Sequence, residues 1–167
     1  MRNRNLLVAF IFFIYQLTAH ADKNSDSVNA QASATVVAPV TLVKTADLLF
    51  GSVAPASFAP GTVTIYPAGG RISTNVVLSS MHLGNPASFY LTGNPGAGFS
   101  INLPSSITLT GPGNSMQLTT FTSSPASTGS FNASGNATIN VGGTLTIGAN
   151  QAAGVYSGSF SITVDYY

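Results

Sequence analysis

Residues 154–167 constrain the fold of this chain more than any other stretch. In this segment the apolar residues Phe160, Ile162, Val164 and Tyr166 alternate with polar ones. Successive side chains of a β-strand point to opposite faces, so the alternation predicts a strand with one apolar and one polar face. A strand of this kind invites association with another chain if its edge stays open. What pairs with it is therefore the first question about function.

The N-terminal residues 1–21 predict a cleaved signal peptide. Two arginines precede an apolar run over residues 6–17, and Ala19 and Ala21 have the small-residue spacing of a cleavage site before Asp22. The run is shorter than the roughly 20 residues that a membrane-spanning helix needs. We therefore expect export across the inner membrane to the periplasm, the cell surface or the extracellular space. An uncleaved anchor is the alternative.

The composition of the exported part excludes several classes of function. Removing 21 of the 167 residues leaves 146, enough for one domain. Its three cations (Lys23, Lys44 and Arg71) stand against four aspartates (Asp22, Asp26, Asp47 and Asp165), so the net charge is −1. Three cations are too few to neutralise a nucleic-acid backbone. Cysteine is absent, so we expect core packing without disulfides to hold the fold.

Short apolar stretches separated by Gly, Pro and Asn predict an all-β domain. We expect strands over residues 62–66, 75–79, 88–92, 99–103, 107–110, 137–141 and 144–147, one around 116–121, and the last strand. Gly142 and Gly143 lie between two alternating runs, which predicts a two-residue hairpin. The prediction is about nine short antiparallel strands, spaced as in a β-sandwich or a small barrel.

The domain organisation follows from where the composition changes. Residues 22–34 are small and polar and predict a mobile N-terminal arm, and residues 35–167 form a single domain. Pro39 near the domain's start indicates an edge, a bulge or a switch between sheets. Residues 123–135, rich in Ser, Ala, Gly and Asn, predict a long surface loop or a hairpin tip.

No group of residues predicts catalysis, so we expect that this protein is not an enzyme. His82 is the only histidine after the signal, and the closest aspartates in sequence, Asp47 and Asp165, are far along the chain. One histidine without cysteine or closely spaced aspartates predicts no metal site. The glycine-rich loop over residues 93–98 leads into a strand rather than a helix, so it lacks the geometry that binds phosphate. We expect no cofactor.

Five stretches together resemble a family of small exported bacterial β proteins, the domain-of-unknown-function family numbered 4402. They are Asp47–Gly51, Gly61–Val63, Gly142–Leu145, Gly148–Gln151 and Gly154–Gly158. Each stretch alone is weak, but their order and combination are specific, and they span most of residues 35–167. This resemblance implies no activity.

The C-terminal segment is also similar to that of pilin subunits assembled by the chaperone–usher route. Gly154 is fourteenth from the end and Tyr166 is penultimate, as in those subunits. The resemblance implies an immunoglobulin-like (pilin-like) β-sandwich that lacks one strand, in a fimbrium of a Gram-negative bacterium with a role in cell adhesion. It also implies two kinds of partner: a periplasmic chaperone, which fills the open groove first, and like subunits, which replace it by strand addition.

The resemblance assigns residues to both partners of such a strand addition. The groove is expected at Gly154 and at the alternating Phe160, Ile162, Val164 and Tyr166. The donor arm is expected within residues 26–38, where five residues share one parity: Val28, Ala30, Ala32, Ala34 and Val36. Most of these are alanines, which bury little apolar area.

Two alternatives to a surface-fibre subunit stay open at this point. In a self-contained periplasmic or secreted binding module, the arm pairs with the last strand of its own chain, because every sandwich has alternating strands. In a small outer-membrane barrel, the last strand also ends in an aromatic residue. The short Ser/Thr-rich strands and the missing aromatic girdles argue against the barrel.

Overall fold

A computed structural model describes residues 26–36 and 38–167 of the chain. The described part contains two units, which meet between Thr35 and Val36. In the first unit, residues 26–35 are exposed and form neither a helix nor a strand. The predicted signal peptide, with Ala19, Ala21 and Asp22 at its cleavage site, lies outside the described residues.

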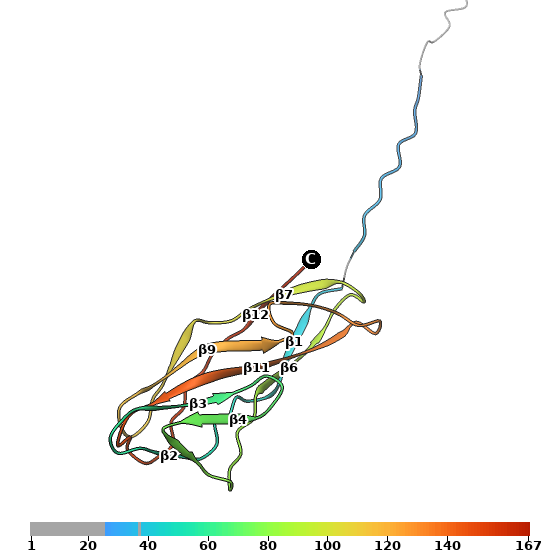
Figure 1. The fold of residues 1–167 in the computed structure, drawn as a ribbon. Coiled ribbons are helices and arrows are strands. Elements are labelled where there is room, and N and C mark those ends of the chain that lie inside the picture. The colour runs from blue at the N-terminus through green and yellow to red at the C-terminus, as the bar shows by residue number, and fades with distance from the viewer. Residues whose placement is uncertain (1–25, 37) are drawn as a thin grey trace, which may run out of the picture. The chain divides into compact units, whose positions relative to one another are not determined.

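The second unit is all-β, with twelve strands in antiparallel sheets and no helix among the described residues (Figure 1). The strands are β1 (Thr41–Ala46), β2 (Val53–Pro55), β3 (Gly61–Ile65), β4 (Arg71–Thr74), β5 (Val76–Leu78), β6 (Ala87–Thr92), β7 (Gly98–Asn102), β8 (Ser106–Leu109), β9 (Met116–Ser124), β10 (Thr128–Ser130), β11 (Asn136–Ile147) and β12 (Thr163–Tyr166). Nothing in the described ranges is a helix long and apolar enough to cross a membrane.

The predicted all-β class is confirmed, but the expected number of about nine strands is too low. The expected strands did not include β1, which Pro39 precedes, and the sequence pattern also missed β2, β4 and β10, which have only three or four residues each. A strand this short offers too few alternating positions to stand out from a loop. The predicted loop over residues 123–135 is also wrong in part, because it contains the end of β9, all of β10 and the buried Phe131.

The largest sheet has seven strands and is built around β11. Residues 136–141 of β11 pair with β6, and residues 143–147 pair with β3. Strand β9 pairs with β11 over residues 140–146 and therefore lies along its opposite edge. Strands β1, β4 and β8 complete the sheet next to β6, β3 and β9, respectively. Each half of β11 thus has a different neighbour on one edge.

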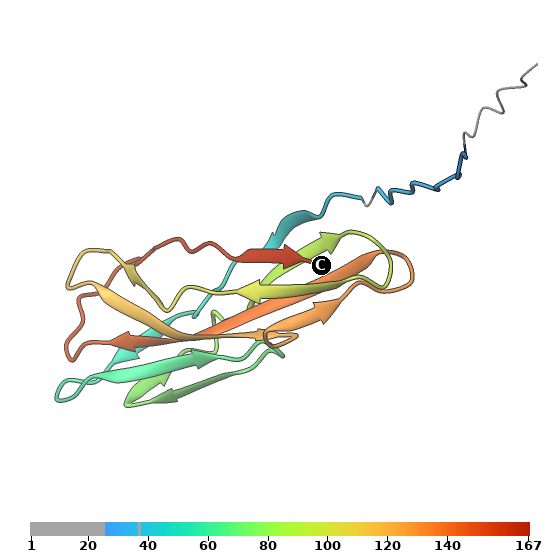
Figure 2. The same ribbon diagram turned by 90° about the horizontal axis from the view of Figure 1, so that it is seen from above.

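Two clusters of buried side chains form the core, and β11 contributes to both. The first cluster contains Phe50, Val63, Ile65, Leu109, Met116, Leu118, Leu145 and Ile147. The second contains Ala87, Phe89, Leu91, Phe99, Ile101, Phe131, Ile139 and Val141. The second cluster joins β6 and β11 of the large sheet to β7, the central strand of the three-stranded sheet β10-β7-β12. Figure 2 shows β12, in dark red, alongside β7.

The hairpin predicted at Gly142 and Gly143 is wrong, because β11 runs through both glycines as one strand. Neither glycine has a positive φ, which a two-residue hairpin turn would require. Instead the ladder to β9 shifts its register between Gly142 and Thr144. A Cβ atom at Gly142 would lie 2.1 Å from the carbonyl oxygen of Ile65. Glycine here marks a bulge with a close backbone approach, the other meaning of a glycine within a strand pattern.

The continuous strand predicts that Gly142→Asn lowers the free energy of unfolding by about 2–3 kcal/mol, since the backbone of Ile65 has to move. Asn-Gly is the favoured sequence of a two-residue hairpin, so a hairpin would tolerate this change. Urea unfolding of the variant measures the effect. Thr138→Asn, at an exposed position of the same strand, is the control and should stay within about 0.5 kcal/mol of the parent. Equal stabilities of the two variants would contradict the continuous strand.

Candidate functional site

Among the described residues, strand β12 forms backbone hydrogen bonds along one edge only. Its described partner is β7, with Thr163 opposite Asn102 and Tyr166 opposite Phe99. The amide of Tyr167 donates to the carbonyl of Gly98 at 3.1 Å. Because successive residues of a strand point their backbone groups to opposite edges, the backbone groups of Val164 and Tyr166 point away from β7. The outer edge of β12 thus offers main-chain donors and acceptors to an incoming strand.

The stretch before β12 runs along the domain without strand pairing. The amides and carbonyls of Thr110 and Ser157 exchange two hydrogen bonds, of 2.9 and 3.0 Å, which fix the beginning of this stretch. From Phe160 to Tyr167, half-buried and exposed residues alternate. Phe160 contacts Phe121 and Phe89, with ring centroids 5.0 and 6.4 Å apart. Its side chain is held by the core while its backbone forms no ladder.

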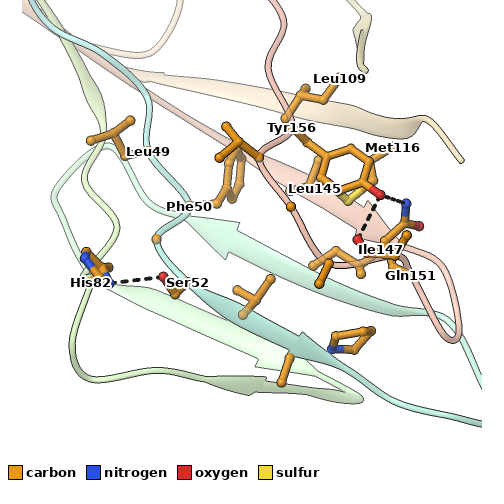
Figure 3. Close-up of a pocket in the computed structure, with 18 of the residues that line it drawn as sticks. Leu49, Phe50, Ser52, His82, Leu109, Met116, Leu145, Ile147, Gln151 and Tyr156 are labelled. Atoms are coloured by element: carbon orange, nitrogen blue, oxygen red, sulfur yellow. Dashed lines mark hydrogen bonds between the residues drawn. The ribbon is translucent and has the colours of Figure 1, made fainter. Parts of the chain in front are cut away.

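A large apolar hollow lies beside residues 151–156, shown in Figure 3. It has a volume of about 900 Å³ and is lined by residues 48–55, 81–83 and 151–156. Its other lining residues, Leu109, Met116, Leu145 and Ile147, all belong to the first core cluster. The buried side chains of that cluster therefore form the floor of the hollow. We call this region the deep hollow.

A second, smaller hollow continues from the deep hollow toward β12. It has a volume of about 310 Å³ and shares Leu48, Leu49, Leu109 and Tyr156 with the deep hollow. Ala87, Phe89 and Phe160 complete its apolar wall. The polar stretch 157–159 also lines it, as do Lys44 and Asp47, which form an ion pair. The two hollows lie along residues 151–160, and the outer edge of β12 follows them in the chain. We call the two hollows and this edge together the groove.

Tyr156 holds the loop that forms one wall of the deep hollow. Its hydroxyl accepts from the amide of Gly113 at 3.0 Å and from Nε2 of Gln151 at 2.8 Å, and it donates to the carbonyl of Ala152 at 3.0 Å. Gly154 in the same loop has a φ of +149°. A Cβ atom there would lie 2.4 Å from Cγ of Pro112, so both backbone and space favour glycine.

Arg71 holds the opposite wall of the deep hollow. Its guanidinium donates to the carbonyl of Phe50 at 2.8 Å, to that of Ser79 at 2.6 Å and to that of His82 at 3.3 Å. A planar guanidinium with five N–H donors is suited to binding several carbonyls at once. One arginine on β4 thus fixes two loops that line the hollow. No pattern in the sequence identified this role.

The chemistry of the deep hollow is that of an apolar binding surface. Oγ of Ser52 lies 3.2 Å from Nδ1 of His82 at its rim. A serine nucleophile needs a histidine that a third group orients, and no described carboxylate bonds to His82. Among residues 26–36 and 38–167, no group of three His, Cys, Asp or Glu side chains is placed to hold a metal ion. The described side chains offer contact area rather than reactive groups.

The residues expected at the groove lie at different points along the groove. Gly154 lines the deep hollow, and Phe160 lines the small one. Ile162, Val164 and Tyr166 pack on the second core cluster. The expected donor residues Val28, Ala30, Ala32, Ala34 and Val36 are exposed and lie outside any strand.

Sequence reasoning missed residues 48–55, which include β2, and the loop 81–83, which together build about half of the lining of the deep hollow. Their apolar residues do not alternate over a strand length, so periodicity gave no signal. The only indication was that residues 47–51 belong to the family resemblance.

Residues 40–166 match the family described as Domain of unknown function (DUF4402). The match covers most of the chain, and the protein therefore belongs to this family. No curated protein and no solved structure matches the chain. The family description assigns no activity, so the geometry of the groove has to carry the functional argument.

Removing the hydroxyl group from two tyrosines of the groove is expected to change the free energy of unfolding differently. Tyr156→Phe removes three hydrogen bonds and should lower the free energy of unfolding by about 1–3 kcal/mol. The hydroxyl of Tyr166 is buried without a described partner. Tyr166→Phe should therefore leave stability unchanged or raise it by about 1 kcal/mol. Thermal and urea unfolding of the pair measure the contrast, and equal losses would contradict the described bonding.

Proposed function

We propose that this protein is an exported structural subunit of a surface fibre with an adhesive role, and that another molecule completes its groove by strand addition. On this proposal the domain is an immunoglobulin-like sandwich that lacks one strand. The observation that carries the proposal is the pairing of β12 along one edge only, beside a groove lined by core residues. An added strand would satisfy the free backbone groups and cover the apolar surface together.

The energetic argument rests on how much apolar surface an added strand removes from water. Burial stabilises by about 25 cal/mol per Å² of apolar surface. Phe160, Ile162 and Val164 are only half-buried, and Met81, Leu83 and Val155 at the rim of the deep hollow are exposed. Main-chain hydrogen bonds add affinity that does not depend on the sequence of the donor. A domain without disulfides has this further route to stability.

The N-terminal arm is the proposed donor for the β12 end of the groove in a neighbouring copy. Val28 and Val36 are 93 % and 95 % exposed, and residues 26–35 form no strand. An exposed arm that forms no strand of its own is available to pair with another molecule. Small alternating residues suit the β12 end, because Ile162, Val164 and Tyr166 already cover the second core cluster there. Before assembly, we propose, a periplasmic chaperone protects the groove.

A self-contained periplasmic or secreted binding module is the second candidate. The observation that favours it is the size of the deep hollow, about 900 Å³. Small-molecule sites are usually apolar clefts of roughly 300–1,000 Å³ with a few polar groups. On this alternative the Ser52 and His82 pair at the rim would orient an apolar ligand. The two candidates differ in whether the arm links molecules.

The fibre proposal predicts that the chain from Asp22 to Tyr167 forms multimers that resist SDS, and that Ala32→Asp abolishes them. Ala32 is the middle one of the five alternating donor residues whose side chains would face the groove. A carboxylate at this position would have to enter an apolar groove without a partner. Gln31→Asp, of the opposite parity, places the same charge on the solvent side and should leave the multimers intact. Gel filtration and SDS electrophoresis without heating measure both variants.

A chain that starts at Thr35 provides the second control, because it lacks most of the arm. It should stay monomeric at every concentration. If the longer chain is itself a stable monomer, and removal of the arm only lowers its melting temperature, then the arm pairs within its own chain. That result would reject the fibre proposal and favour the binding module.

A further inference from the structure

The outer face of the large sheet carries a regular pattern of threonines. The sequence Thr-x-Thr occurs in two neighbouring strands, as Thr62 and Thr64 in β3 and as Thr144 and Thr146 in β11. The residue between the two threonines of each strand is buried in the first core cluster, so the threonines point away from the core. The ladder places Thr64 opposite Thr144 and Thr62 opposite Thr146, which makes an array of two by two.

Three further strands extend this array in the same two rows. Strand β9 follows β11 and β8 follows β9 on one side, and β4 follows β3 on the other (Figure 1). The added positions are Gln117 and Thr119 on β9, Thr108 and Ser106 on β8, and Thr74 and Ile72 on β4. Eight of the ten side chains carry a hydroxyl group, and none is charged. We call these ten residues the hydroxyl array.

The side chains of the hydroxyl array are held in place. Oγ1 of Thr64 lies 2.9 Å from Oγ1 of Thr144, and Nε2 of Gln117 donates to Oγ1 of Thr108 at 2.9 Å. Threonine is branched at Cβ, which restricts its χ1 angle. Thr146 on the middle strand is exposed. The array therefore presents fixed hydroxyl and methyl groups to the solvent, and it loses little conformational entropy when it binds.

The spacing of the hydroxyl array is set by sheet geometry. Neighbouring strands lie about 4.8 Å apart, and side chains two residues apart on one strand repeat at about 6.7 Å. Both values are close to repeats of the oxygen lattice of hexagonal ice, along its a and c axes. Fixed hydroxyl groups on such a grid can take the places of water molecules at an ice surface. Charged side chains would instead orient water around themselves, and the array has none.

We infer that the hydroxyl array binds ice, at a second site separate from the groove. The array faces away from the first core cluster, whereas the deep hollow has that cluster as its floor. The inference goes beyond strand addition and needs only the proposed export, because ice grows outside the cell. On the proposed fibre, this site would attach the cell to a crystal of ice.

The twist of the sheet limits the size of the contact with ice. Neighbouring strands of a sheet rotate by roughly 20–25° relative to one another. The five strands of the array therefore do not lie in one plane, and the match to a flat crystal face is best over the central strands β3, β11 and β9. A contact of this size slows the growth of crystals. We expect inhibition of recrystallisation without a large depression of the freezing point.

Uptake into growing ice tests the inference directly. Ice is grown slowly on a cooled probe from a stirred solution of the chain from Asp22 to Tyr167, and the protein in the ice is compared with that left in solution. Thr146→Lys should lower the fraction in the ice at least about tenfold, because an ammonium group at the interface loses its hydration without gaining a counter-charge. The same variant should lose the inhibition of recrystallisation.

Matched variants locate the binding. Thr138→Lys is the control, because Thr138 is an exposed residue of the same strand that lies outside the array, and this variant should enter ice as the parent does. Gln117→Lys, at an exposed position of β9 inside the array, should lose uptake as Thr146→Lys does. Urea unfolding checks that each variant is folded. Ala32→Asp, which is expected to abolish the multimers, should still enter ice as a monomer.

Four results would overturn the inference. Uptake of the parent no greater than that of Thr146→Lys would reject binding to ice, and normal multimers in the same preparation would leave the fibre proposal standing. An equal loss in Thr138→Lys would place the effect outside the array. Uptake that Ala32→Asp abolishes would assign the effect to assembly. Retention on an insoluble neutral polysaccharide that Thr146→Lys abolishes, without uptake into ice, would make a glycan the ligand.

Discussion

The long strand β11 is the element on which the rest of the structure depends. It pairs with β6, β3 and β9, and its side chains enter both core clusters. This arrangement needs the backbone of Ile65 to approach Gly142 more closely than any Cβ atom would allow. The register shift after Gly142 lets one strand change neighbours without ending. Without that shift the two halves of the large sheet would have no common strand.

The groove is a consequence of how the core is covered. The buried side chains of the first core cluster form the floor of the deep hollow beside residues 151–156, where the chain passes as a loop held by Tyr156. The second cluster is covered by β12, which is paired on one side only among the described residues. An extended partner would therefore meet unpaired backbone at one end of the groove and an apolar hollow at the other.

Low charge has two consequences for a protein of this kind. Charged side chains on edge strands normally discourage unwanted pairing. Here β12 carries Asp165 as its one charged residue, whose side chain is exposed beside the free edge. The residues that line the deep hollow also include no Asp, Glu, Lys or Arg. A surface with so few charged side chains does not discourage pairing with a neutral strand. Association would then depend on shape and apolar contact rather than on electrostatic steering.

The sequence alone was sufficient to predict the all-β class, most strands of five or more residues and the alternation along the last strand, because a period of two follows from strand geometry whatever the neighbours are. It was also sufficient to suggest the family. It did not distinguish a hairpin from a bulge at Gly142 and Gly143, since glycine permits both a positive φ and a close backbone contact. Only the tertiary structure, with Ile65 against Gly142, selected the bulge.

The candidate site also has one part that the sequence predicted and one part that only the tertiary structure revealed. Gly154 and the four alternating residues could be named from the sequence, because their pattern is local. The deep hollow could not, because it is formed by residues 48–55, 81–83 and 151–156, which are separate in the chain and which Arg71 and Tyr156 hold in place. The sequence thus determined which residues of the last strand face the core. The tertiary structure decided that a hollow lies beside residues 151–156, since only packing between separate segments determines its walls.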